Sequence, residues 1–171
     1  MTQISFTVYG KALPAGSKQS FPVLNKEAEV VRTKTGRILT RVKHDNPKTV
    51  YWMSHVANAA GEVMNGRPLL EGALRLTLTF YRLRAKSHFG TGRNAAVLKK
   101  SAPRSPITRP DTVKLTRAVE DALTGVVWLD DSQVTTHLLR KRFGENERVE
   151  VVIDEDELDS QIACKYEREE A

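Results

Sequence analysis

The chain of 171 residues is 40% hydrophobic and 28% charged, which suits one globular domain with a buried core and excludes a collagen-like, coiled-coil or wholly disordered chain. A single cysteine, Cys164, excludes an internal disulfide framework and a zinc site built from several cysteines. No apolar run approaches the roughly 20 residues of a membrane helix, and the first ten residues lack the apolar stretch of a signal peptide, so we expect a cytoplasmic protein.

The charge is unevenly distributed along the chain. Residues 1–144 contain 24 Lys and Arg against 10 Asp and Glu, a net charge of +14, whereas residues 145–171 contain 3 against 11, a net charge of −8. Because Lys and Arg that face phosphates release condensed counterions, so basic a body favours a polyanionic partner. The alternative is a soluble basic domain that binds no polyanion. The acidic end is typical of a solvated tail, which could compete with nucleic acid for the basic face.

The N-terminal part of the chain predicts a strand, a loop, a hairpin and a helix. Apolar and polar residues alternate over 4–9, which indicates a strand, and the Pro-, Gly- and Ser-containing residues 11–22 indicate a loop. Two short apolar runs within residues 30–42 flank Gly36 and predict a hairpin that turns there. An Asn-Pro pair then predicts a helix over residues 47–64, which ends at an Asn-Gly pair.

The middle of the chain contains a clear strand and a long basic segment. Leucines alternate with polar residues over 74–80, which predicts a strand. Residues 85–109 show no usable periodicity and exceed the ~12–15 residues at which structureless loops become uncommon. They contain Lys, Arg and His but no Asp or Glu. We therefore expect this segment to be a functional or mobile loop that binds phosphates.

The remaining elements complete an α+β domain. The pattern predicts a helix over 112–124, a short strand over 126–129, and two strands, 134–142 and 147–153, that form a hairpin across Gly144. The order of elements predicts a single domain with a mixed β-sheet and two main helices packed on it. We place this domain at residues 1–155 and the acidic tail at residues 156–171.

The carboxylates of the basic body are concentrated in one segment. Five of the ten fall within 21 residues, directly after the basic loop: Asp111, Glu120, Asp121, Asp130 and Asp131. Mg²⁺ prefers a few carboxylates, water and substrate phosphate oxygens as ligands. Such a metal ion lowers the pKa of an attacking water and stabilises the charge on a phosphodiester during hydrolysis. The cluster therefore predicts a metal site for phosphate chemistry.

Each of these acids also has a structural explanation. Asp111 follows a proline at a helix start and could be only the N-cap. The pair at 130–131 could form only a turn between strands. The acids at 120–121 could pair with Arg117 on the exposed face of the helix. None of the four histidines has the spacing of a metal ligand.

One position on the predicted helix departs from its amphipathic pattern. Five apolar residues recur at the spacing of a single buried face, namely Leu115, Ala118, Val119, Ala122 and Leu123. The opposite face carries polar side chains, apart from Val113. The local pattern favours a polar residue there.

The 26 residues from Arg109 to Val134 read RPDTVKLTRAVEDALTGVVWLDDSQV. This string resembles the RusA family of crossover-junction endodeoxyribonucleases, which phages and prophages often carry. The family core reads D-x-D-N/K-L-x-K/R, then D-A-L, then D-D-x-Q-V. The resemblance extends more loosely to the opening strand, with Lys11 and Pro14 in the loop after it, and to the closing strands.

The resemblance implies a small α+β homodimer that binds four-way DNA junctions and cuts symmetric strands with Mg²⁺, or Mn²⁺, held by aspartates. The first motif aspartate of the family falls on Asp111, and the catalytic aspartate falls on Asp131, with Asp130 beside it. The basic residue on the family's helix falls on Arg117, where lysine is usual. Because arginine stays protonated, Arg117 would act as a fixed positive charge near the scissile phosphate.

This sequence departs from the family pattern at the second motif aspartate, which falls on Val113. Valine cannot ligate a metal. In one interpretation Glu120 replaces the lost ligand, directly or through water, although two helical turns of about 10.8 Å separate the positions. In another, Asp111, Asp130 and Asp131 hold the metal with additional waters. In a third, the protein binds junctions but cleaves them weakly or not at all.

We therefore expect a Mg²⁺-dependent endonuclease that resolves four-way (Holliday) junctions in DNA recombination and repair, in a bacterial host of a phage or prophage. A non-catalytic or architectural DNA-binding protein is the first alternative, and an RNA-associated basic protein is the second. Recognition would depend on backbone shape and charge. The basic residues expected to contact DNA are Lys86, Arg93, Lys99, Lys100, Arg104, Arg109, Lys114, Arg37 and Arg41.

Overall fold

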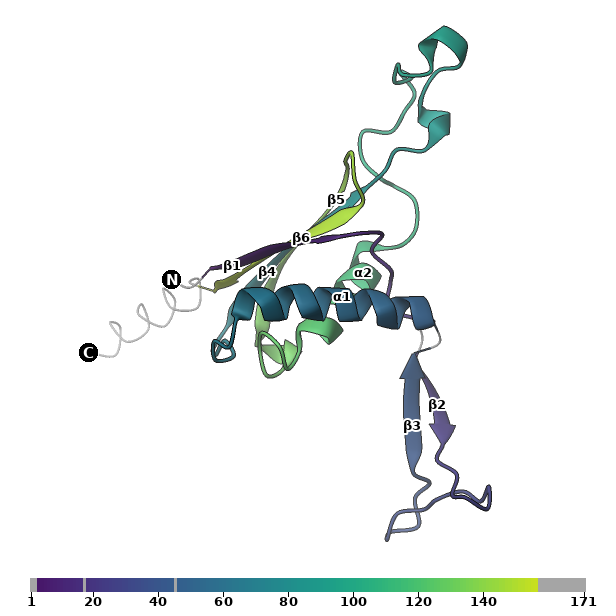
Figure 1. The fold of residues 1–171 in the computed structure, drawn as a ribbon, viewed down its shortest axis with the longest axis vertical. Coiled ribbons are helices and arrows are strands. Elements are labelled where there is room, and N and C mark those ends of the chain that lie inside the picture. Colours follow the sequence, from purple (N-terminus) through teal and green to yellow (C-terminus); the bar gives the residue numbers. More distant parts are fainter. Residues whose placement is uncertain (1–2, 17, 45, 157–171) are drawn as a thin grey trace, which may run out of the picture.

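The computed structural model describes residues 3–16, 18–44 and 46–156, which form an α+β domain with two extensions (Figure 1). The central sheet is mixed and has the strand order β1-β6-β4-β5. Its strands are β1 (Ile4–Tyr9), β4 (Leu74–Arg82), β5 (Val134–Phe143) and β6 (Arg148–Glu155). Strand β4 pairs in parallel with β5 and antiparallel with β6, and β1 forms the other edge through β6. The predicted fold class is confirmed.

The core lies between this sheet and two helices, α1 (Pro47–Met64) and α2 (Thr112–Leu123). Alternate residues of β4 and β6 face the helices and are fully buried, among them Leu76 and Val151. The five apolar residues predicted to form the buried face of α2 are all buried. Among the described residues, no helix is long and apolar enough to span a membrane.

The ends of α1 follow the predicted capping pattern. The side chain of Asn46 accepts a hydrogen bond from the backbone N–H of Lys48, and Pro47 occupies the first turn. At the other end Asn65 adopts a left-handed conformation with φ of 44° and donates its N–H to the carbonyl of Gly61. The local sequence therefore sets both limits of this helix.

The predicted hairpin between the last two strands is wrong, because β4 lies between β5 and β6. The connection instead crosses the end of β4, where the N–H of Gly144 donates to the carbonyl of Arg82. A Cβ atom at Gly144 would lie 2.9 Å from the ring of Tyr81, so the crossing requires glycine. A short connection therefore does not show that the two strands it joins pair with each other.

The strand predicted at 126–129 is also wrong. These residues form a turn after α2, closed by a hydrogen bond from the N–H of Gly125 to the carbonyl of Trp128. Trp128 makes only isolated bridges, to Leu70 and Thr124. The apolar run reflects burial, since Trp128 is fully enclosed, and four residues are too few to distinguish a buried turn from a strand.

Part of the loop predicted at 11–22 is a strand. Residues Lys18–Pro22 form β2, which pairs antiparallel with β3 (Thr40–His44) in a separate two-stranded sheet. A proline is tolerated in such a ribbon, because it has no central strand to interrupt. The predicted turn at Gly36 is confirmed: its φ is 80°, and the N–H of Thr33 donates to the carbonyl of Arg37 across it.

Two extensions project from opposite ends of the domain (Figure 1). The arm (residues 18–44) contains β2 and β3. The basic loop (residues 85–109) contains two short 3₁₀ turns, Lys86–His88 and Gly92–Asn94. The arm also exposes several large apolar side chains, namely Phe21, Leu24, Val30, Ile38 and Leu39. The predicted acidic tail beyond residue 156, with Cys164, lies outside the described residues.

Candidate functional site

Asp111 stands at the N-terminal end of α2 but does not cap it. It occupies the N-cap position, yet its side chain accepts no capping hydrogen bond from the helix. Its side chain is 62% exposed and makes one surface ion pair with Lys114, 3.6 Å away. Exposed pairs of this kind contribute little to stability. The capping explanation therefore fails for Asp111, and its carboxylate remains accessible to a ligand.

Asp111 lines a cleft of about 560 Å³, and the other charged residues that line this cleft are all basic. The side chains of Lys11, Arg82, Arg109 and Lys114 line it together with Asp111. Four cations around one carboxylate create a local positive potential that attracts phosphate. We call this the basic cleft. It contains two of the residues predicted to contact DNA, Arg109 and Lys114.

Side chains from the sheet hold the segment that leads into α2. The Lys141 ammonium group on β5 donates to the carbonyl oxygens of Thr108 at 3.0 Å and Pro110 at 3.1 Å. The guanidinium group of Arg82, at the end of β4, donates to the carbonyl of Arg109 at 2.6 Å. Charge-assisted hydrogen bonds of this kind are stronger than neutral ones. They fix the backbone directly before Asp111.

The loop after β1 forms the opposite wall of the basic cleft. The N–H of Ala15 donates to the carbonyl of Lys114 on α2, and the hydroxyl of Thr49 on α1 donates to the carbonyl of Pro14. These bonds attach the loop to both helices. Lys11 thereby lines the same cleft as Asp111 although 100 positions separate them in the sequence.

The Asp130-Asp131 pair lies beyond the C-terminal end of α2, where the two acids have different environments. The carboxylate of Asp130 accepts a hydrogen bond from the N–H of Ser132 and caps the 3₁₀ turn at Asp131–Gln133. Hydrogen bonds from the side chain of Ser132 and, to a smaller extent, from its backbone lower the pKa of the Asp130 carboxyl. Asp131 is exposed. The turn explanation thus accounts for Asp130 but leaves Asp131 available.

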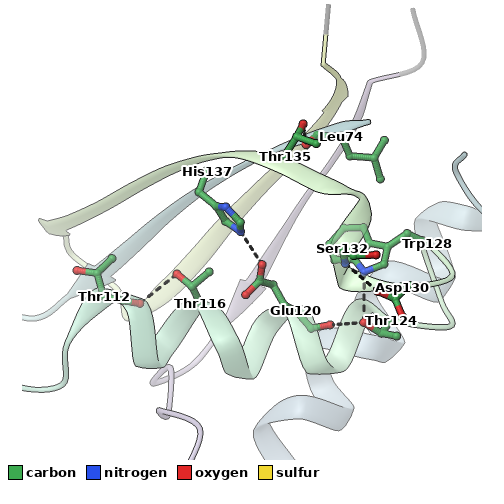
Figure 2. A network of polar contacts seen from close by, with 10 residues as sticks. All are labelled: Leu74, Thr112, Thr116, Glu120, Thr124, Trp128, Asp130, Ser132, Thr135 and His137. Atoms are coloured by element: carbon green, nitrogen blue, oxygen red, sulfur yellow. Dashed lines mark hydrogen bonds and ion pairs between the residues drawn. The ribbon is translucent and has the colours of Figure 1, made fainter. Parts of the chain in front are cut away.

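Gln133 secures this turn to the rest of the domain. Its side-chain oxygen accepts from the N–H groups of Leu129 and Asp130, and its amide nitrogen donates to the carbonyl of Leu70 at 3.0 Å. The preceding turn is closed by the Trp128 indole, which donates to the hydroxyl of Thr124 at 3.2 Å (Figure 2). These bonds hold Asp131 in a defined position after the helix.

The two accessible aspartates lie at opposite ends of α2. Figure 2 shows Thr112 at one end of the helix and Asp130 near the other. The 12 residues of α2 span about 18 Å at 1.5 Å per residue. Among the described residues, no group of three or more His, Cys, Asp or Glu side chains is close enough to hold a metal ion. One chain therefore does not gather the predicted ligands into a single site.

Val113, Arg117 and Glu120 lie along α2 between these ends. Val113 is 65% exposed and Arg117 is exposed, as the helical pattern predicts for the outer face. Glu120 instead faces the sheet, where its carboxylate contacts His137 on β5 (Figure 2). The helix thus presents a valine and an arginine on the surface that connects the two aspartates.

The other residues predicted to contact DNA lie on the two extensions. Five are exposed on the basic loop: Lys86, Arg93, Lys99, Lys100 and Arg104. Lys99 also donates its ammonium group to the carbonyl of Ser87, so it supports the loop itself. On the arm, Arg37 is exposed beside the turn and Arg41 belongs to β3. The predicted contact residues are therefore distributed over both extensions and the basic cleft.

Three residues important to this site were not predicted as site residues: Lys11, Arg82 and Lys141. All three lie within two residues of the end of a strand of the central sheet. Their sequence neighbourhoods contain other basic residues that point elsewhere. Only the folded structure identifies Lys11 and Arg82 as lining the cleft of Asp111 and Lys141 as holding the backbone before it.

Two comparisons with known proteins show what this chain is similar to. The model of a family described as "Endodeoxyribonuclease RusA" matches residues 21–154. The chain is also similar to "Uncharacterized protein YqaN" of Bacillus subtilis (strain 168), with 29% identity over 157 residues, covering 91% of this chain and 98% of that protein.

Proposed function

Because the chain belongs to the RusA endodeoxyribonuclease family, we propose that it is a Mg²⁺-dependent nuclease that cuts four-way DNA junctions as a homodimer. The observation that carries this proposal is Asp111, an accessible carboxylate surrounded by the cations of the basic cleft. Phosphate and a divalent cation both have binding groups there. A purely structural N-cap would instead bond to its own helix.

The available donors suit the metal chemistry of this family. Asp111 and Asp131 offer hard carboxylate oxygens, are exposed, and lack the capping bond that occupies Asp130. Such oxygens are the ligands that Mg²⁺ and Mn²⁺ prefer. When bound, the ion would stabilise negative charge on the phosphodiester and promote ionisation of water. We assign Asp111 and Asp131 as its protein ligands, with Asp130 positioning Asp131.

The separation of these ligands supports a site shared between two subunits. Asp111 and Asp131 flank α2, whose 12 residues span about 18 Å, a greater length than one ion bridges. A two-fold axis across the middle of α2 would place the helices of two subunits antiparallel, with Asp111 of one beside Asp131 of the other. The contact is isologous, so two equivalent sites form together. This arrangement matches a reaction that cuts two opposed strands.

The remaining groups of the site would bind and orient the DNA. Lys11, Arg82 and Arg109 would hold phosphates in the basic cleft, where Lys141 fixes the backbone before Asp111. Arg117, on the surface between the two ends of α2, would contribute a permanent positive charge near the scissile phosphate. The basic loop and the arm would contact the DNA arms further from the cut.

A mixing experiment tests both the nuclease and the shared site. We expect Mg²⁺-dependent cutting of a labelled four-way junction by the native protein, and none by Asp111→Asn or Asp131→Asn alone. When the two variants are unfolded together and refolded, heterodimers would contain one native site and one doubly substituted site. Nicking of one strand should then return. Continued inactivity of the mixture, with native-like dimerisation, would assign both ligands to one chain.

A second candidate function is junction binding without cleavage. Val113 supports it, because the family's second motif aspartate is absent and no described carboxylate cluster replaces it. The accessible Asp131 weighs against it. Binding of the junction by the native protein, without cutting in Mg²⁺ or Mn²⁺, would favour this candidate.

A further inference from the structure

A second cavity lies next to the basic cleft, at the N-terminal end of α1. It measures about 470 Å³ and is lined chiefly by apolar and aromatic surface. Four aromatic side chains line it, and we therefore call it the aromatic pocket: Tyr9, Tyr51, Trp52 and His55. The volume lies within the range of small-ligand sites in proteins. None of its rings belongs to the nuclease site proposed above.

Two of the four aromatic residues that line this pocket are largely exposed. Tyr9 is 68% exposed and Tyr51 is 67% exposed, whereas Trp52, which also lines the pocket, is 4% exposed. The rings of Tyr51 and His55 have centroids 4.4 Å apart at an interplanar angle of 52°. The pair is tilted rather than stacked in parallel, and Tyr51 is largely exposed, so its ring is accessible to a ligand.

The charge around the aromatic pocket favours a ligand with a negative backbone. Lys11 and Lys48 line it, and its lining contains no carboxylate. The first turn of α1 also contains no acidic residue, and the partial positive charge of a helix N-terminus favours anions. An aromatic surface bordered by lysines has the composition of a site for single-stranded nucleic acid.

The aromatic pocket and the basic cleft adjoin each other. Lys11 and Leu13 line both, because the chain turns after β1 at Gly10, whose φ is 118°. This turn directs Tyr9 toward the pocket and keeps Lys11 between the two cavities. A DNA strand with a phosphate in the cleft would therefore have a neighbouring nucleotide at the pocket.

We infer that the aromatic pocket receives an unstacked nucleobase from the strand that is cut. This inference rests on the proposed function, since it places the base next to a phosphate held near Asp111. Stacking on tyrosine accepts any base, so the site would recognise an unpaired base at the branch rather than a particular sequence. Capture of that base would fix which phosphate enters the basic cleft, and hence where the strand is cut.

Photocrosslinking tests the contact directly. Junctions would carry 5-iodouracil at single positions on either side of the branch point, be bound by the full chain in EDTA so that no cutting occurs, and be irradiated. We expect one position close to the branch to crosslink to the peptide that contains Tyr51 or the one that contains Tyr9. Crosslinks confined to the basic loop or the arm would overturn the inference.

Two matched variants test the energetic role of the ring. Tyr51→Phe keeps the aromatic face, whereas Tyr51→Leu keeps an apolar side chain without it. Loss of one stacked base should weaken junction binding by Tyr51→Leu roughly tenfold, while Tyr51→Phe binds like the native protein. Binding to a linear duplex of the same sequence should change little in either variant. Equal affinities of Leu and Phe variants for the junction would overturn the inference.

The remaining outcomes separate this inference from the proposed function. If Tyr51→Leu converts a dimer into monomers in sedimentation, a second copy of the chain occupies the pocket and the inference fails. If the native protein crosslinks at Tyr51 but never cuts in Mg²⁺ or Mn²⁺, the nuclease proposal fails and the base pocket stands. If the native protein does not bind junctions at all, both fail.

Discussion

The carboxylate of Glu120 on α2 lies 2.6 Å from Nε2 of His137 on the edge strand β5 (Figure 2). The contact joins the middle of the helix to the sheet, and the Glu120 side chain is only 16% exposed. A carboxylate with this partner and this burial is directed away from the outer face, where Val113 lies. Our proposal therefore does not use Glu120 as the replacement for the missing family aspartate.

Glu120→Gln provides the first prediction. Glutamine keeps the size of the side chain and its ability to bond with His137, so Mg²⁺-dependent cleavage should stay within the same order of magnitude. Because His137 is 36% exposed, we expect the free energy of unfolding to fall by less than about 1 kcal/mol. Junction cleavage and urea denaturation measure the two effects. A hundredfold loss of cleavage at unchanged stability would instead make Glu120 a metal ligand.

Val113→Asp is expected to increase activity. The position is 65% exposed in the first turn of α2, where a carboxylate also interacts favourably with the helix terminus. The added oxygen should lower the Mg²⁺ concentration needed for half-maximal cleavage without loss of stability. Val113→Asn is the matched control, because it is polar and of similar size but uncharged. Equal metal dependence of the native protein and both variants would show that position 113 lies outside the metal site.

Local sequence patterns predicted the elements around the site better than they predicted how those elements pair. The buried face of α2, both ends of α1 and the exposure of Val113 follow from periodicity and capping, which depend on neighbouring residues. The insertion of β4 between β5 and β6 depends on the pairing of distant strands. No pattern within 147–153 distinguishes a partner in β5 from one in β4.

The same limit applies to the candidate site. Residue types and spacing indicated a cluster of acids, and the family resemblance singled out Asp111 and Asp131 within it, although both also had structural explanations. Their difference from Asp130 depends on hydrogen bonds, since one of two adjacent aspartates caps a turn and the other does not. The approach of Lys11 and Arg82 to Asp111 depends on the register of the sheet and the docking of the loop after β1.

Lys141→Met should reduce cleavage because Lys141 positions the backbone before Asp111, rather than because a positive charge is lost. Lys141 lies on β5 and holds the carbonyl oxygens of Thr108 and Pro110, so its loss would free the backbone before Asp111. We expect a loss of unfolding free energy of about 1–2 kcal/mol and a fall in cleavage rate of roughly tenfold to a hundredfold. Arg140→Met removes a charge from the adjacent exposed position and should leave the rate unchanged. Equal losses in the two variants would indicate a general effect of charge.

We expect Asp131 to be needed for cleavage and Asp130 to be needed for stability. Asp131→Asn should abolish cleavage while the melting temperature stays native, because the side chain is exposed and caps nothing. Asp130→Ala should lower the melting temperature through loss of the cap, yet keep measurable cleavage at low temperature. Calorimetry and junction cleavage distinguish these results. The reverse pattern would exchange the two roles.

The stabilising effect of Asp130 should also depend on pH in one direction. Its pKa in the folded protein is lowered by the hydrogen bonds from Ser132, so the charged form is favoured by folding. The contribution is therefore complete above the pKa of the unfolded state and is lost as the pH falls through the lower, folded pKa. The difference in melting temperature between native protein and Asp130→Ala should be constant near neutrality and narrow below about pH 4. A difference that widens on acidification would contradict this assignment.

The basic loop should determine a large part of the salt dependence of junction binding. Arg93, Lys100 and Arg104 are exposed on it. Within the part of the chain that the structure describes, their side chains form no hydrogen bond to the loop, whereas Lys99 donates to Ser87. Each phosphate contact contributes about 0.9 to the slope of log affinity against log salt concentration. Replacing the three residues by alanine should reduce that slope by up to about 3, whereas Lys99→Ala should act mainly through the stability of the loop. Binding titrations in EDTA at several salt concentrations measure the slope, and an unchanged slope would remove the loop from the DNA-binding surface.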